Sequence, residues 1–324
     1  MSQAQAAMQA AAKPDSRPTA GRVEWIELAR AVGILLVVAG HTLVGPIATV
    51  IFHFHMPLFF MLSGTVFSTR PIAEWISRRT SSLLVPYIAW AVTLSALGVT
   101  LRYLGFPGAP GVQVKALLIG GEWLRGWFGT FWFVTCLFGA LASYNILRLR
   151  FDLTRPALVI LMAASAVVGI VLAPHALPWT INAVPIAVVL LWIGELCRRR
   201  RPPRWFVLPA AAAGVIGLLF GAPLDLKHGN LGTPGLSLPA AVALSYCIFE
   251  LSQWAALKLG RRSLIHQLAA GSLVIMFVHQ AIQISIRSVA PEVVVFLAAT
   301  VGSLGVYWGV NNMGRWPRRV FAGR

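Results

Sequence analysis

One stretch near the N-terminus, residues 25–64, sets ionisable side chains into two long apolar runs that a short connection joins. These side chains are Glu27, Arg30, His41, His53 and His55. An ionisable group inside an apolar segment of membrane length costs about 3 kcal/mol on insertion scales, so such groups usually have a function. A carboxylate, a guanidinium and several imidazoles could bind an anion, move protons or hold a metal.

Arg30 and His41 lie on nearly the same face of the first predicted helix. They are eleven residues apart, which at about 100° per residue is three turns plus about 20°. Glu27 lies within about 60° of that line, and Arg30 is about 16 Å from His41 along the axis. A polar stripe therefore crosses most of this helix. Arg30 could instead reach the headgroups beside Glu27, and His41 could be a neutral imidazole bonded between helices.

Three histidines also raise the question of a zinc site. His53 and His55 are two residues apart, so they point to different sides of a helix. No carboxylate lies near them in sequence to orient a metal ligand. We therefore expect an acid–base role and no metal. Pro57 follows and can bend the helix, which would free backbone carbonyls near the site.

The composition identifies the class of protein. Hydrophobic residues make up 57% of the 324 residues and charged residues 11%, whereas a soluble domain has about 25% charged residues. Runs close to the roughly 20 residues that span a bilayer recur along the chain. They are 26–46, 50–68, 82–104, 127–147, 156–173, 179–197, 205–221, 237–257, 264–286 and 291–312. We predict an all-α polytopic membrane bundle of about ten transmembrane helices.

The net charge of +17 has a topological explanation, because the 27 lysines and arginines fall in alternate loops. One side receives only Arg102, Lys115, Arg125, Lys227 and Arg287. All the others fall on the opposite side. The positive-inside rule then places both termini in the cytoplasm, and the pattern argues against a nucleic-acid partner.

Three regions follow from this pattern. Residues 1–22 are polar and lack the apolar core of a signal peptide, so we predict a disordered cytoplasmic tail. Residues 23–314 form the transmembrane domain, and residues 315–324 are a basic cytoplasmic tail. The three cysteines lie in or beside apolar runs, which is typical of packing and not of a disulfide framework.

Several motifs resemble one known family. ELARAVGILLVVAGH followed by FHMPLFFMLSG resembles the opening of the acyltransferase 3 family, the membrane-bound O-acyltransferases that modify cell-surface sugars. SRRTSSLLVPY, GTFWFVTCLF and GSLVIMFVH resemble later segments of the same family, in the same order. The resemblance covers about 30 to 280, and Glu27 stands where the family usually has Asp.

The resemblance implies a reaction and a location. The expected reaction transfers an acyl group, usually acetyl, from cytoplasmic acyl-CoA to a hydroxyl of an extracytoplasmic or lipid-linked glycan, in the bacterial inner membrane. Acyl-CoA is polyanionic, and arginine is suited to bidentate phosphate contacts. Arg30, Arg78 and Arg79 lie at the cytoplasmic level and are the expected anchors. Arg78 and Arg79 by themselves could simply be part of the positive-inside signal.

A histidine in the outer half of the membrane suits this chemistry. A sugar hydroxyl is a poor nucleophile at pH 7, and a neutral imidazole can take its proton, an effect worth about 10²–10⁴-fold. An acyl-histidine intermediate is an open alternative. The oxyanion would need donors, for which Ser63, Trp132 and His55 are candidates. We therefore predict His41, as general base, with Glu27, His55 and His279 as catalytic residues, and Arg30, Arg78, Arg79, Ser63 and Trp132 as the donor-binding residues.

Glu195, Glu250 and three further histidines lie outside this set of predicted site residues. Glu195 precedes four arginines and is expected to pair with them, whereas Glu250 is the more interesting buried acid. His175, His228 and His266 lie in or next to loops and are not expected in the site. The main rival function is a transporter, in which the polar stripe is a proton or solute path. A non-catalytic scaffold is a third interpretation and would not require His41.

Overall fold

The structure is a computed structural model that describes residues 20–106, 109–111, 113–259 and 262–324. These residues form helices and contain no extended strand. The longer helices in the first half are α2 (Ala20–Thr42), α3 (Pro46–Phe52), α4 (His55–Thr65), α5 (Ile72–Arg79), α6 (Val85–Tyr103), α7 (Val114–Ile119) and α8 (Trp132–Arg150). Those in the second half are α9 (Pro156–Leu172), α10 (Val184–Arg200), α11 (Val207–Phe220), α12 (Ser237–Leu259), α13 (Ser263–Ile286), α14 (Glu292–Asn312) and α15 (Arg315–Ala322).

The predicted all-α membrane bundle is confirmed. Among the described residues, 8 helical segments are long and apolar enough to cross a membrane. Two shorter apolar segments, Pro156–Leu172 and Arg204–Phe220, lie where the fifth and seventh spans were predicted. Only helices satisfy their own backbone polar groups within one segment, which explains why apolar sequence of this kind takes this form.

The second predicted span is interrupted just before His55. Helix α3 ends at Phe52 and α4 begins at His55, with Phe54 between them at φ −143° and ψ −10°. The break therefore precedes Pro57, which lies in the first turn of α4, where a helix needs no backbone N–H donor. The consequence is that His55 stands at the start of a helix.

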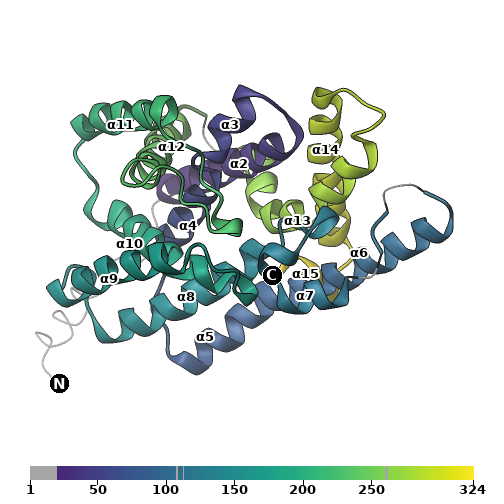
Figure 1. The fold of residues 1–324 in the computed structure, drawn as a ribbon, viewed down its shortest axis with the longest axis horizontal. Coiled ribbons are helices and arrows are strands. Elements are labelled where there is room, and N and C mark those ends of the chain that lie inside the picture. The colour runs from purple at the N-terminus through teal and green to yellow at the C-terminus, as the bar shows by residue number, and fades with distance from the viewer. Residues whose placement is uncertain (1–19, 107–108, 112, 260–261) are drawn as a thin grey trace, which may run out of the picture.

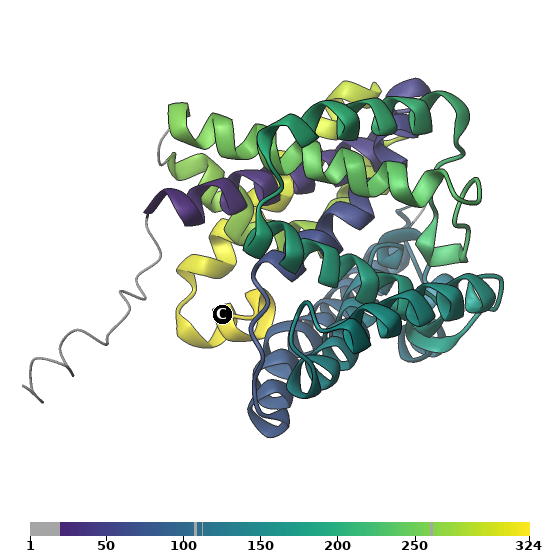
Figure 2. The ribbon, with the colours of Figure 1, turned by 90° about the vertical axis from the view of Figure 1, so that its left-hand side faces the viewer.

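One end of the bundle gathers many of the arginines, and we call it the basic end. The Arg198 guanidinium donates to the carbonyl of Thr65 at 2.5 Å, which joins α10 to the end of α4. The Arg70 backbone N–H donates to the Asn145 side chain at 3.0 Å, which adds α8. Figure 2 shows the start of α2 and the C-terminal α15 on this same side of the molecule, at the left.

Loops meet at the other end, which we call the opposite end. The Val44 backbone N–H donates to the carboxylate of Glu292 at 3.0 Å, so the connection after α2 contacts the start of α14. Lys227 Nζ donates to the carbonyl of Leu124 at 2.5 Å and joins two further loops. Each contact joins two segments that are far apart in the sequence.

Helices α2 and α4 lie at the centre of the bundle. Helix α2 packs against α12, α13 and α14, and α4 packs against α10. Figure 1 shows α9 and α11 toward one side of the molecule and α14 toward the other. The contact of α4 with α10 depends on two glycines, since a Cβ on Gly64 would lie 2.0 Å from the Leu191 carbonyl oxygen and one on Gly194 2.0 Å from that of Met61. Small residues allow such close approach of membrane helices.

The two predicted tails differ in what the structure says of them. Most of the predicted N-terminal tail, residues 1–22, lies outside the described residues. The predicted C-terminal tail contains helix α15, which packs on α6 and α14. The Trp90 indole N–H donates to the carbonyl of Phe321 at 2.9 Å, and the two rings lie 5.2 Å apart between centres. This segment is therefore part of the bundle.

Candidate active site

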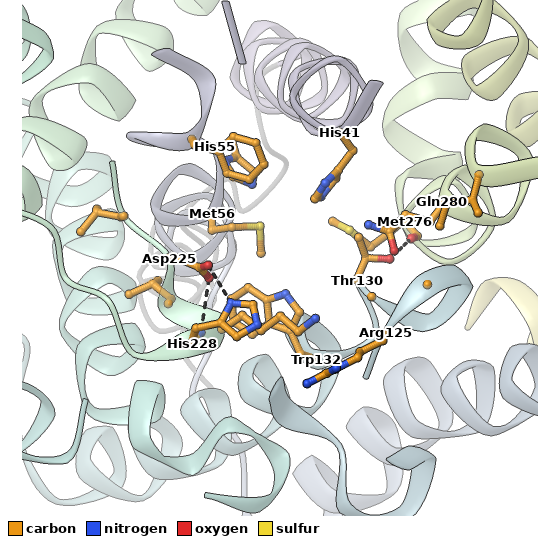
Figure 3. Close-up of a pocket in the computed structure, with 17 residues that line it drawn as sticks. His41, His55, Met56, Arg125, Thr130, Trp132, Asp225, His228, Met276 and Gln280 are labelled. Carbon is orange, nitrogen blue, oxygen red and sulfur yellow. Dashed lines mark hydrogen bonds and ion pairs between the residues drawn. The ribbon is translucent and has the colours of Figure 1, made fainter. Parts of the chain in front are cut away.

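A cavity of about 470 Å³ lies toward the opposite end, and we call it the histidine cavity. Helices α2, α3, α4 and α13 supply one part of its wall, and the start of α8 with the loops that precede α8 and α12 supplies the rest (Figure 3). Its lining residues are His41, Phe52, His55, Met56, Arg125, Gly126, Gly129, Thr130, Trp132, Leu224, Asp225, Leu226, Lys227, His228, Met276, Gln280 and Ile284. A volume in this range is typical of small-molecule sites, which occupy about 300–1,000 Å³.

His41 is at the centre of a group of rings. The His41 ring lies 6.2 Å from the His55 ring and 5.5 Å from the His279 ring, between centres. Phe52 packs edge-on against both His41 and His55, at 5.6 and 4.9 Å. His41 forms no hydrogen bond with the described part of the chain, and Figure 3 shows its ring facing the cavity. Its nitrogens are therefore available to a ligand.

His55 and His279 are each fixed by a backbone carbonyl four residues earlier. His55 Nδ1 contacts the carbonyl of Ile51 at 3.0 Å, and His279 Nδ1 contacts that of Ile275 at 2.7 Å. A carbonyl only accepts, so each ring carries its proton on Nδ1 and leaves the Nε2 lone pair free. His279 is fully buried, and its Nε2 has no partner among the residues that the structure describes.

His53 is engaged elsewhere. Its Nδ1 lies 2.8 Å from the carbonyl of Thr49, and its Nε2 lies 3.2 Å from that of Gly221. Both nitrogens thus contact acceptors on the backbone, outside the histidine cavity. In the described ranges, no group of three or more His, Cys, Asp and Glu side chains is arranged to hold a metal ion.

The loop between α11 and α12 closes one side of the histidine cavity. Leu224 and Leu226 are buried in the core. Asp225 accepts a hydrogen bond from the His228 ring at 2.7 Å. Burial lowers the pKa of Lys227, which the Asp225 carboxylate partly offsets. The loop therefore brings charged groups to a cavity otherwise lined by membrane helices.

The residues before and within α8 and α13 complete the wall. The Thr130 hydroxyl donates to the Met276 carbonyl at 2.7 Å, which ties the approach to α8 onto α13. Trp132 is 6% exposed, and its indole N–H makes no hydrogen bond with the residues that the structure describes. The Gln280 side chain lies against Gly129, because a Cβ added at position 129 would lie 2.4 Å from the Oε1 atom of Gln280. Since the Trp132 N–H has no partner among the described residues, it is a donor open to a ligand.

A second cavity of about 170 Å³ lies toward the basic end, and we call it the inner cavity. Its polar lining includes Arg30, Ser63 and Arg79, and most of its other lining is apolar. The Ser63 hydroxyl donates to the carbonyl of Phe59 at 2.8 Å. Met276 lines both cavities. This buried side chain, 2% exposed, is thus shared by the cavity that contains the arginines and the cavity that contains the histidines.

The predicted site residues divide into three groups. His41, His55 and Trp132 line the histidine cavity, with His279 directly behind His41. Arg30, Arg79 and Ser63 line the inner cavity. Arg78 and Glu27 line neither of these two cavities.

Arg78 and Glu27 have other partners. The Arg78 guanidinium lies 3.1 Å from the Glu74 carboxylate and is largely exposed. Glu27 contacts the His266 ring at 3.1 Å. Within the described chain, Glu27 is therefore paired with a histidine on α13 and forms no hydrogen bond with Arg30.

Sequence reasoning did not identify the cavity's four other ionisable residues, namely Arg125, Asp225, Lys227 and His228. A signal for two of them was present. Basic residues are disfavoured on the extracytoplasmic side, and Arg125 and Lys227 are among the few that the charge pattern predicts there. His228 was not expected in the site, because nothing local in the sequence shows that this loop closes over α2.

The fold and these cavities together describe a multi-pass membrane protein with a polar site between its helices. A family model described as an acyltransferase domain, acyltransferase 3, matches residues 23–311. The chain therefore belongs to the acyltransferase 3 family and is a membrane acyltransferase. No curated protein and no solved structure matches the chain.

Proposed function

We propose that this protein is an O-acyltransferase of the bacterial inner membrane. It moves an acetyl group from cytoplasmic acetyl-CoA to a hydroxyl of an extracytoplasmic or lipid-linked glycan. The observation that carries the proposal is that Met276 lines both the cavity with Arg30 and Arg79 and the cavity with His41. A donor entering from the basic end and an acceptor entering from the opposite end would meet beside His41.

The inner cavity suits the acyl-bearing arm of the donor. It is small and mostly apolar, with Arg30 and Arg79 among its lining residues. An arm of pantetheine type is long and thin, and its thioester must travel inward from the basic end to reach His41. Met276 can make way for it, because methionine is unbranched and adapts to irregular space.

The histidine cavity suits a polar acceptor. Trp132 offers a broad ring and a free N–H, and Arg125, Asp225 and Lys227 offer charged groups. Such a combination of an aromatic surface with a few polar groups is typical of sites that orient a small ligand. We assign this cavity to the sugar that carries the reacting hydroxyl.

His41 acts as the general base. Its neutral imidazole takes the proton of the hydroxyl while the hydroxyl oxygen attacks the thioester carbonyl carbon. The Trp132 N–H donates to the oxyanion that develops. His55, whose Nδ1 proton faces the Ile51 carbonyl, presents an acceptor at Nε2 and does not fit the predicted role of oxyanion donor. When the intermediate collapses, the carbon–sulfur bond breaks and His41 returns the proton to the sulfur of CoA. The acyl group leaves as an ester of the glycan.

His279 assists His41 from behind. Its Nδ1 proton is held by Ile275, so its Nε2 can accept a hydrogen bond from a neighbouring imidazolium. The His41 ring, 5.5 Å away between centres, is the neighbour. His279 would thus stabilise the charged form that His41 takes during the reaction, as a carboxylate does for histidine in other acyl-transfer sites.

Purified protein incubated with radiolabelled acetyl-CoA tests the proposal. We expect label to move to a membrane glycan extract, and free CoA to appear in step with it. The His175→Ala variant, which changes an exposed loop histidine, should transfer label as the wild type does. Movement of intact solute across proteoliposomes without any acyl transfer would contradict the proposal and favour a transporter.

A further inference from the structure

The C-terminal segment forms a second basic site that sequence reasoning treated only as a tail. A pocket of about 630 Å³ lies between the start of α13, the end of α14 and helix α15, and we call it the C-terminal pocket. Its lining residues are His266, Gln267, Tyr307, Trp308, Asn311, Arg315, Arg318, Arg319 and Arg324. Four guanidinium groups thus share one pocket.

These arginines lack the partners that usually hold such a group together. Arg315, Arg318 and Arg319 are spaced three and four residues apart, so they share one face of α15. None of them, nor Arg324, forms an ion pair with Asp or Glu in the described residues. Like charges on one helix face destabilise the helix. A counter-ion would therefore stabilise this arrangement, and the described residues supply none.

Arg318 points to what the missing counter-ion is. Its Nη2 donates to the carbonyl of Asn311 at 2.8 Å, which fixes the guanidinium, while its buried Nε has no acceptor in the part of the chain that the structure describes. A buried guanidinium N–H without an acceptor is costly. Phosphate oxygens are the acceptors that match an arginine fork in charge and geometry.

The helix that carries these groups is fixed in place. The Phe321 carbonyl accepts a hydrogen bond from the Trp90 indole of α6, and Ala322 is buried. Gly323, at φ +68°, approaches the Ser82 backbone so closely that a Cβ would lie 2.3 Å from the Ser82 carbonyl oxygen. The arginines are therefore held against the bundle beside the segment that follows Arg79, and are not on a free tail.

The C-terminal pocket is adjacent to the inner cavity. Arg324 lines the C-terminal pocket and follows Gly323, which packs on the backbone of Ser82, the residue before Leu83 of the inner cavity. The inner cavity, at about 170 Å³, is too small for a nucleotide. The C-terminal pocket has the volume and the charge that a phosphorylated nucleotide requires.

We infer that the C-terminal pocket binds the phosphates of the acyl donor's nucleotide moiety, while the acyl-bearing arm enters the inner cavity past Arg30. This inference rests on the proposed function, since it takes acyl-CoA as the donor. The main phosphate contacts are then assigned to Arg318 and Arg319. Arg78, which the sequence predicted for this role, is exposed and paired with Glu74. Anionic lipid headgroups carry the same phosphate chemistry, and the test separates the two sources.

The test uses the full chain in nanodiscs of phosphatidylcholine alone or with phosphatidylglycerol. The double variant Arg318→Gln/Arg319→Gln is compared with Arg155→Gln/Arg204→Gln, which removes the same charge from two exposed arginines. We expect the first pair to weaken acetyl-CoA binding at least about tenfold, given the strength of charge-assisted hydrogen bonds. The control pair should change it less than about twofold, the size expected for exposed charges.

A donor without phosphates completes the test. Turnover of S-acetylpantetheine should be the same in the wild type and in the Arg318/Arg319 variant, which also shows that the variant is folded. Arg315→Gln, at an exposed position, is a milder second variant and should also weaken acetyl-CoA binding. Unchanged acetyl-CoA affinity in both variants would overturn the inference.

The lipid outcome and the failure of the proposed function are distinct results. If the arginine variants lose bound phosphatidylglycerol while their acetyl-CoA affinity is unchanged, the pocket holds lipid and the inference is wrong. If the wild type itself binds no acetyl-CoA in either nanodisc, the proposed function is wrong, and the inference that rests on it is wrong as well. Weakened acetyl-CoA binding in phosphatidylcholine alone supports the nucleotide site.

Discussion

At the scale of single residues, the histidines differ in what holds them. His55 and His279 are each tied to a backbone carbonyl, and His53 is tied to two. His41 has no such partner in the described chain and faces a cavity. A base must exchange its proton with a ligand, so the unattached histidine is the one suited to that role.

The role of His279 leads to a prediction about catalysis. His279→Leu should lower kcat by about 10²-fold, at the lower end of acid–base effects, because the His41 imidazolium loses its acceptor. KM for both substrates should remain unchanged. Steady-state kinetics on purified variants measures this, with His279→Gln, which keeps a hydrogen-bonding group, expected to recover part of the rate. A rise in KM with normal kcat would instead indicate a binding role.

Met276 leads to a prediction about access. Met276→Phe should obstruct the passage between the two cavities and lower kcat by about 10²-fold, since small misplacements of a reacting group have effects of that size. Acetyl-CoA affinity should be unchanged, because the proposed phosphate contacts lie nearer the basic end. Binding and turnover measured on the same preparation separate the two effects. Normal turnover in this variant would mean that the donor reaches His41 by another route.

At the scale of elements, a buried ion cluster joins α8 to α10. Glu195 is 1% exposed and accepts from the Tyr144 hydroxyl at 2.7 Å, and it pairs with Arg148 at 3.2 Å and Arg199 at 2.7 Å. Sequence reasoning expected Glu195 to pair with the arginines that follow it, which is correct. The contact with Arg148 comes from another helix, and no local spacing could predict it.

Glu195→Gln should destabilise the bundle by about 3–5 kcal/mol, because it leaves the buried Arg148 without its counter-charge. Glu74→Gln is the matched control, since Glu74 pairs with Arg70 and Arg78 at the surface, and should cost no more than about 1 kcal/mol. Thermal unfolding in detergent measures both. Equal shifts in the two variants would contradict the assignment of Glu195 to a structural role.

The glycine contact between α4 and α10 gives a second test of the packing. Gly194→Ala should destabilise the protein by about 1–3 kcal/mol, as overpacking does, because the new Cβ meets the Met61 backbone. Gly305→Ala should be neutral or slightly stabilising, since no described atom lies within 4 Å of the point where its Cβ would stand. The thermal unfolding temperature should therefore fall in Gly194→Ala and not in Gly305→Ala, and an equal fall in both would refute the packing.

The sequence predicted elements better than it predicted pairs of elements. Hydropathy located the helices because each one must satisfy its backbone alone in lipid. The stripe of Arg30 and His41 on α2 was predictable, since both lie on one helix and its period is known. Three features could not be predicted. They are the pairing of Glu27 with His266, the outward position of Arg78, and the closure of the Asp225–His228 loop over His41. Each depends on how distant segments pack.

At the scale of the whole molecule, two cavities approach each other from opposite ends of the bundle. The inner cavity holds Arg30 and Arg79, the histidine cavity holds His41, and Met276 lines both. A membrane enzyme that joins a cytoplasmic donor to an external acceptor needs this arrangement. A site open to one side alone would require one substrate to cross the membrane first.

Sided proteoliposomes test this arrangement most directly. The protein is reconstituted in one orientation, with labelled acetyl-CoA at the basic end and glycan acceptor at the opposite end, in the wild type, His41→Ala and His175→Ala. We predict transfer of label to the acceptor in the wild type and in His175→Ala, and none in His41→Ala, whose donor affinity stays normal. Transfer by His41→Ala at the wild-type rate would contradict the central role of His41 between the two cavities.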